Sequence, residues 1–130
     1  MRDLLALLEP EGRNLTWSIQ DLEAVGDPEK LKTDLLEIEE NAKHSPQGLI
    51  MKWEELVELA EALKDVWNPW IVGCRDSKLI PKVIYSTEKV DQCEIVIEVF
   101  DSSYLRVYAR DDEIIRRIAG KFQDVSVTSI

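Results

Sequence analysis

The 130-residue chain carries 26 acidic and 16 basic side chains, a net charge of −10, and 45% of its residues are apolar. This composition predicts one globular domain over residues 1–130, and because no apolar run approaches the ~20 residues of a membrane span, we expect a cytoplasmic protein without membrane contact. The acidic excess also disfavours nucleic acid as a partner, since phosphate contacts require clustered basic side chains.

The chain opens with a short apolar segment followed by a strand pattern. Residues 2–9 favour a short helix with leucines on one side, and Pro10 should end it. The sequence leaves open whether residues 1–14 are only a loosely attached N-terminal segment. Residues 15–25 alternate between apolar and polar side chains, which predicts a strand, and the alternation changes phase near Asp21, where we expect a bulge.

Two longer amphipathic helices are predicted next. Asp27 and Pro28 have the character of a helix start, and apolar residues at a 3.6-residue spacing continue to Ala42. A second helix is predicted over residues 52–67, and Pro69 should terminate it. Each helix has a single apolar stripe, so each should cover a sheet face and expose its other side to water.

The outer face of the second predicted helix is a stripe of acids spaced at helical intervals. Like charges four residues apart repel one another by a few tenths of a kcal/mol, so a cationic neighbour would stabilise this face. The acids belong to the acidic half of the chain, because residues 1–73 have a charge balance of −9 and residues 74–130 one of −1. A solvated surface is the simpler interpretation, and a site for a basic protein partner is the functional one. The stripe consists of Glu54, Glu58, Glu61 and Asp65.

Cysteine and histidine usage points to neither a metal site nor a cofactor, and we predict none. Residues 70–74 are almost continuously apolar, which is typical of a strand buried on both faces. Cys74 and Cys93 have no Cys-x-x-Cys or Cys/His spacing, so we expect buried thiols and disfavour a disulfide in a reducing compartment. His44 has no neighbouring ligand set and is expected at the surface.

Residues 94–110 predict a β-hairpin with only one favourable register. When Phe100 lies opposite Tyr104, aliphatic side chains meet on one face, and Glu98 meets Arg106 on the other. A slip by one residue would move one strand's apolar set to the wrong face, and each matched pair contributes roughly 0.2–1 kcal/mol. The connecting loop, residues 101–103, is expected to form the turn.

The chain closes with a helix and a strand. Asp111 should cap a short helix whose first turn is acidic and whose last turn contains Arg116 and Arg117, the charge order that a helix dipole favours. Gly120 is expected just past the end of this helix. A final strand is predicted over residues 122–127.

Together these elements predict a two-layer α+β fold with a mainly antiparallel sheet of about five strands, two long amphipathic helices and a short C-terminal helix. No GxSxG, HExxH, Walker or GxGxxG pattern is present, so we expect no enzyme activity. The favoured hypothesis is a non-catalytic protein-interaction module, of the inhibitor or immunity type, that binds a basic partner. The alternative is a self-associating or small-ligand-sensing regulatory domain, for which a homodimer is left open. Its surface would be the polar hairpin face with Tyr104, Arg106 and Tyr108.

Overall fold

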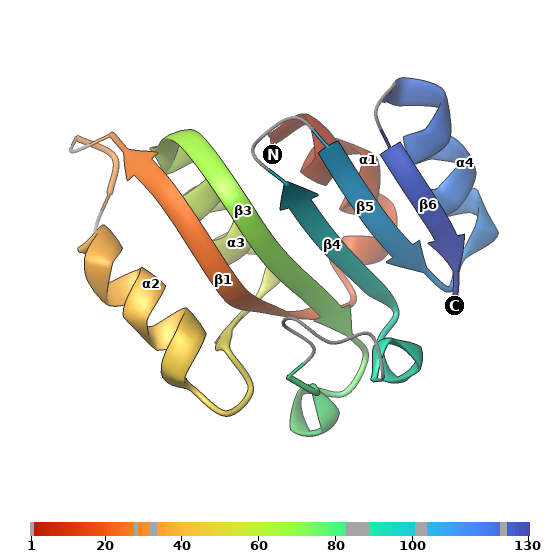
Figure 1. The fold of residues 1–130 in the computed structure, drawn as a ribbon, viewed down its shortest axis with the longest axis horizontal. Coiled ribbons are helices and arrows are strands. Elements are labelled where there is room, and N and C mark those ends of the chain that lie inside the picture. Colours follow the sequence, from red (N-terminus) through yellow and green to blue (C-terminus); the bar gives the residue numbers. More distant parts are fainter. Residues whose placement is uncertain (1, 28, 32–33, 83–88, 101–103, 123–124) are drawn as a thin grey trace.

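The protein has an α+β fold in which four helices accompany one six-stranded mixed sheet, within the residues that the structure describes (Figure 1). The computed structural model describes residues 2–27, 29–31, 34–82, 89–100, 104–122 and 125–130. The helices are α1 (Arg2–Gly12), α2 (Leu35–His44), α3 (Trp53–Ala62) and α4 (Asp112–Lys121). The strands are β1 (Thr16–Gly26), β2 (Leu49–Met51), β3 (Leu63–Cys74), β4 (Ile95–Phe100), β5 (Tyr104–Ala109) and β6 (Val125–Ser129). They are ordered β2-β1-β3-β4-β5-β6.

The α+β class and the mainly antiparallel sheet are confirmed, and the expected numbers and lengths of the elements are matched only roughly. The sheet has six strands, and its last pair, β5 and β6, is parallel because α4 carries the chain from one strand to the next. The two helices expected to be long have 10 residues each, as does the C-terminal helix that was expected to be short. None of the helices in the described residues has the length and apolar composition needed to cross a bilayer.

The hairpin of β4 and β5 has the predicted register. Phe100 pairs with Tyr104, Glu98 with Arg106 and Ile95 with Ala109. The pairing extends beyond the strands, since the backbone amide of Arg110 donates to the carbonyl of Glu94 over 3.0 Å. The loop at residues 101–103, predicted as the turn, lies outside the described residues.

The main core lies between the sheet and the helices. Figure 1 shows α1, α3 and α4 behind the sheet, and apolar residues from all three pack against the alternate residues of the central strands that face them. Residues 1–14, whose attachment the sequence leaves open, include α1, and Leu4, Leu5 and Leu8 of this helix are at most 4% exposed. The sheet side of this core is made of Trp17, Ile19, Ile71, Ile95, Ile97, Leu105, Val107 and Ala109.

A smaller apolar cluster covers part of the opposite sheet face. We call it the second-face cluster, and it joins side chains of β3 and β4 to the connection between these strands, which contains the short 3₁₀ turns η1 (Ser77–Leu79) and η2 (Val90–Gln92). Because both faces of β3 are covered near its end, the prediction of a strand buried on both sides at residues 70–74 is confirmed. The cluster consists of Trp70, Val72, Cys74, Ile80, Val90, Cys93 and Val96.

The predicted helix over residues 52–67 is too long. The helix α3 ends at Ala62, and the next residue, Leu63, begins β3 without a connecting loop. The carbonyl of Ala62 accepts from the amide of Asp27, beyond the end of β1, over 2.8 Å. Pairing with β1 therefore converts the segment up to Trp67 from predicted helix to strand.

Pro69 does not end a helix, as was predicted, but lies inside β3. Between Trp67 and Trp70, two residues of β3 lie opposite one residue of β1, which defines a bulge. Asn68 has a φ of +49°, a conformation that asparagine tolerates better than most residues. The predicted irregularity of β1 near Asp21 is confirmed, because the pairing shifts on both sides of that residue.

The helix predicted from Asp27 begins later. α2 starts at Leu35, and Asp34 is its N-cap, with a side-chain oxygen that accepts from the amide of Leu36 over 3.0 Å. Asp27 instead accepts from the amide of Glu29 in a local turn, and Pro28 lies outside the described residues. The apolar stripe predicted for this helix nevertheless packs on the main core.

Pro10 does not end α1, which continues to Gly12. Contacts from elsewhere hold the last turns: the indole of Trp17 donates to the carbonyl of Gly12 over 2.9 Å, and the guanidinium of Arg117 donates to the carbonyl of Leu7 over 2.6 Å. Gly120, expected past the end of α4, lies within that helix, whereas the predicted Asp111 cap is confirmed.

Candidate functional site

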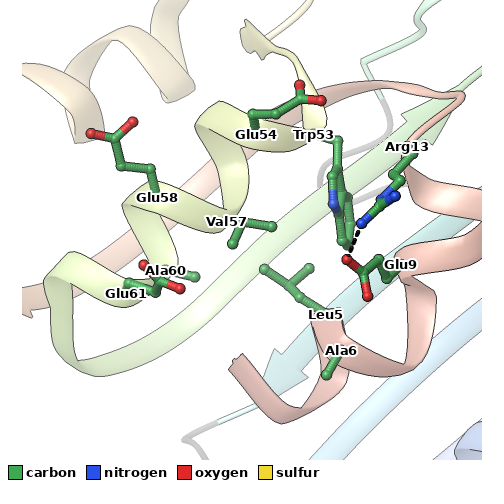
Figure 2. Close-up of a pocket in the computed structure, with 10 residues that line it drawn as sticks. All are labelled: Leu5, Ala6, Glu9, Arg13, Trp53, Glu54, Val57, Glu58, Ala60 and Glu61. Atoms are coloured by element: carbon green, nitrogen blue, oxygen red, sulfur yellow. Dashed lines mark hydrogen bonds and ion pairs between the residues drawn. The ribbon is translucent and has the colours of Figure 1, made fainter.

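A groove with a volume of about 580 Å³ lies between α1 and α3 (Figure 2). Its base is part of the main core, because Leu5, Trp53 and Ala60 are at most 5% exposed. Val57 is half-buried and Ala6 is exposed, so these two side chains offer the accessible apolar surface. Figure 2 shows Leu5 and Val57 pointing toward one another across the groove.

Two tryptophans set the distance between the walls of the groove. Trp53, the first residue of α3, packs on Trp17 of β1 with ring centroids 5.7 Å apart and an interplanar angle of 46°. Gly12, at the end of α1, is in close contact with this pair, since a Cβ at that position would lie 2.6 Å from Cζ3 of Trp53. The start of α3 is further held by Glu55, which accepts from the amide of Lys52 over 3.1 Å.

The rim of the groove is acidic. Glu54, Glu58 and Glu61 line it from α3, and all three are exposed. Glu9 of α1 lies at the end near Trp53 and forms an ion pair of 2.5 Å with Arg13. The described lining thus has four carboxylates and one guanidinium, the latter already paired. Such a rim attracts cationic side chains, and the accessible apolar surface of Val57 and Ala6 can contact an aliphatic one.

The structure brings together three of the four predicted acids and separates the fourth. Glu54, Glu58 and Glu61 all line the groove, whereas Asp65 lies on β3, paired with Val25 and outside the groove lining. The four acids share a helical spacing in the sequence. Because α3 ends before Asp65, the acidic stripe on the observed helix does not include this residue.

Sequence reasoning did not find the α1 wall of the groove. Leu5, Ala6, Glu9 and Arg13 all come from the N-terminal segment, and three of the four are exposed. The leucines of this helix predict only that one of its faces is buried. Nothing in a single sequence says that its neighbour is α3.

A second groove, of about 340 Å³, lies on the other side of α3, toward α2 and β2. Leu31, Ile38 and Ile50 contribute its apolar surface, and the side chain of Ile50 is 41% exposed. Glu58 lines both grooves. The carboxylate of Glu58 therefore lies on a ridge with an apolar depression on each side.

The alternative site, on the other sheet face, has a paired arginine and a buried acid. Arg106 Nη1 lies 3.7 Å from Glu98 Oε2. Glu98 is 7% exposed, and burial raises the pKa of its carboxyl while the Arg106 guanidinium lowers it. Tyr108 is half-buried and packs on the second-face cluster, and the side chain of Tyr104 lies outside the described residues. Arg106 and Glu98, two charged groups of this face, thus already interact with each other.

Neither the chemistry of the groove nor comparisons identify a reaction. The described groove lining contains no hydroxyl, thiol or imidazole, and no three His, Cys, Asp or Glu side chains of the described residues are arranged to hold a metal ion. His44 is exposed on α2, with Nε2 lying 3.1 Å from a carboxylate oxygen of Glu40. Comparison with protein-family models, with curated proteins and with solved structures found no match.

Proposed function

We propose that this protein is a non-catalytic, cytoplasmic protein-interaction module whose groove between α1 and α3 binds a basic segment of a partner protein. One observation carries the proposal: Glu54, Glu58 and Glu61 are placed together along an apolar groove rather than spread over the surface. An inhibitor or immunity-type role against a basic protein is one instance of this class.

The two parts of the site would act at different stages of binding. The carboxylates attract a cationic partner over several ångströms, which raises the association rate, whereas apolar contact with Val57 and Ala6 lowers the dissociation rate. An amphipathic helix with aliphatic and basic residues one turn apart matches this arrangement. Because the rim acids are exposed, their contribution should decrease steeply with salt.

The test begins with affinity purification from the native host and then measures association kinetics with the captured partner. The triple charge reversal Glu54→Lys, Glu58→Lys and Glu61→Lys should lower the association rate at least about tenfold at low salt, since steering of this kind changes rates by one to three decades. The expected circular dichroism spectrum is that of the native fold, because all three side chains are exposed.

A matched control separates steering by the groove from steering by net charge. Reversal of three exposed acids outside the groove, Glu29, Glu37 and Asp112, changes the net charge by the same amount. We expect this control to slow association less than about threefold, because these acids lie outside the groove and the Coulomb energy between two charges falls with their separation. Equal slowing by the two triple variants, or no slowing by either, would refute the groove as the binding site.

The second candidate is self-association through the sheet face with Tyr104, Arg106 and Tyr108. It is favoured by the position of Arg106, whose side chain is 37% exposed on the face opposite α1, α3 and α4. Sedimentation equilibrium distinguishes the two candidates. A monomer at tens of micromolar would refute self-association, and a dimer broken by Arg106→Glu would support it.

A further inference from the structure

Two buried cysteine side chains meet at one end of the sheet. Cys74 is the last residue of β3, and Cys93 follows η2, immediately before the chain enters β4. The side chains are 3% and 1% exposed, and both belong to the second-face cluster. The amide of Glu94 donates to the carbonyl of Gly73 over 3.0 Å, so the residues that follow Gly73 and precede Glu94 are held side by side.

The two sulfur atoms are in hydrogen-bond contact, and their surroundings are not equivalent. The sulfur of Cys74 accepts from the thiol of Cys93 and from the backbone amide of Glu94. The hydrogen bond from Cys93 lowers the pKa of Cys74, whereas the same bond, together with burial, raises the pKa of Cys93. The carbonyl of Lys89, 3.9 Å from the sulfur of Cys93, is a second acceptor for its S–H. Cys74 is therefore the more acidic of the two thiols.

We propose that Cys74 and Cys93 form a redox-reactive pair that hydrogen peroxide converts to an intramolecular disulfide. The thiolate of Cys74 attacks one oxygen of the peroxide, the O–O bond breaks, and Cys74 becomes a sulfenic acid as hydroxide leaves and takes up a proton. The sulfur of Cys93 then attacks the sulfenic sulfur, so that the S–S bond forms, the S–O bond breaks and water leaves. Overall, two thiols and one peroxide give one disulfide and two waters.

Access to the pair requires only a local opening. Cys74 ends a strand and Cys93 caps a three-residue 3₁₀ turn, and such ends of elements open at a lower free energy than the core. The neighbouring Arg75 side chain is 80% exposed, so solvent lies close to the pair. A guanidinium nitrogen of Arg110 donates to the carbonyl of Cys93 over 3.2 Å and helps to hold the turn closed. We expect slower oxidation than for an exposed thiol, but no global unfolding.

The fold should favour this disulfide over its reduced form. A thermodynamic cycle links the folding equilibrium to the equilibrium of disulfide formation. The factor by which folding increases the equilibrium constant for disulfide formation therefore equals the factor by which the disulfide increases the equilibrium constant for folding. Measured disulfides stabilise folded proteins by factors of about tenfold to a thousandfold. The structure favours the bond because both thiols lie in the second-face cluster, on segments that the hydrogen bond between Glu94 and Gly73 holds side by side.

The experiment uses the intact wild-type protein and glutathione redox buffers. After peroxide treatment, the intact mass should decrease by two hydrogen atoms, and a peptide map should show Cys74 joined to Cys93. The equilibrium constant for disulfide formation should be at least about tenfold higher in buffer than in urea that unfolds the chain. Three results would each refute the proposed redox pair. They are the addition of oxygen without loss of hydrogen, the formation of disulfide-linked dimers, and an equilibrium constant for disulfide formation that is equal or smaller in the folded protein than in urea.

Two single variants test the roles of the cysteines. Cys93→Ser retains a donor toward Cys74, so Cys74 should react with peroxide and leave a sulfenic acid that dimedone traps. Cys74→Ser leaves only Cys93, whose pKa burial still raises, so labelling should be at least about tenfold slower, because the thiolate is the nucleophile. Equal labelling of the two variants would refute the assignment of Cys74 as the attacking thiol. The wild-type equilibrium remains decisive if either variant fails to fold.

Discussion

Arg117 of α4 forms a bidentate ion pair with Glu11, near the end of α1, and 106 residues separate the two in the sequence. The side chains are only 25% and 27% exposed, and the same guanidinium donates to the carbonyl of Leu7. The hydrogen bond from Arg117 to Glu11 therefore connects the two helices. It also holds α1, which forms one wall of the groove, in place.

Loss of this ion pair should destabilise the fold. Glu11→Gln keeps the shape of the side chain but removes its charge, and we expect the free energy of unfolding to decrease by about 1–2 kcal/mol, as for hydrogen bonds between charged, partly buried groups. Urea denaturation measures this change. Arg13→Gln is the control, because it breaks the exposed Glu9–Arg13 pair and should cost less than about 0.5 kcal/mol. Similar losses in both variants would mean that Arg117 has no special role.

Two glycines should respond in opposite ways to alanine. Gly48 has a φ of +75°, and an added Cβ would lie 2.4 Å from Ser18 Oγ and 2.7 Å from the carbonyl oxygen of Ile19. Gly48→Ala should therefore destabilise the protein by about 1–3 kcal/mol. At Gly120, a Cβ would meet nothing within 4 Å, so Gly120→Ala should stabilise α4 by about 0.5 kcal/mol. Thermal unfolding of both variants measures the contrast, and a neutral Gly48→Ala would contradict the described turn.

The buried carboxyl of Glu98 should make stability depend on pH. Burial raises the pKa of Glu98 above its ordinary value of 4.5, even with Arg106 alongside. The folded protein thus binds this proton more tightly than the unfolded chain does. The stability contribution of Glu98 is therefore complete below pH 4.5 and is lost as the pH rises through the raised pKa.

Glu98→Gln removes this titration. The free energy of unfolding of this variant, relative to that of wild type, should therefore increase from pH 4 to pH 7 by an amount that the pKa shift of Glu98 determines. Urea denaturation at several pH values measures the difference. Asp112→Asn, an exposed substitution at the start of α4, serves as the comparison, and we expect no such trend for it. Parallel pH profiles for wild type and Glu98→Gln would show that Glu98 titrates alike in the folded and unfolded states.

The acids of the groove should differ in their effect on stability. Glu61 lies in the last turn of α3, where the helix dipole disfavours a negative charge, and Glu54 lies in the first turn, where it favours one. Glu61→Gln should raise the free energy of unfolding by about 0.3–0.5 kcal/mol, and Glu54→Gln should lower it by a similar amount. Denaturation at low and high salt tests this, since both effects should decrease as salt screens the charges. Changes of the same sign would contradict it.

Local patterns predicted those elements whose neighbours in space are also neighbours in sequence. The hairpin of β4 and β5 is the clearest case, because each strand carries its own two-residue period and only one register matches Glu98 with Arg106. The cap of α4 at Asp111 is equally local, since one side chain and the next two residues define it. The acids from Glu54 to Glu61 were also assigned correctly to a helix and to its exposed side.

The remaining features depended on contacts between distant segments, which no single stretch of sequence contains. The segment from Leu63 to Trp67 has a pattern compatible with a helix, and it becomes strand because its backbone pairs with β1. The groove exists because α1, at the other end of the acidic half of the chain, packs beside α3. The sequence by itself determined the two-residue period of the β4–β5 hairpin and the acidic face of α3 as far as Glu61. Only the tertiary structure decided where α3 ends and which helix lies beside it, because backbone pairing and core packing between distant segments outweigh local propensity.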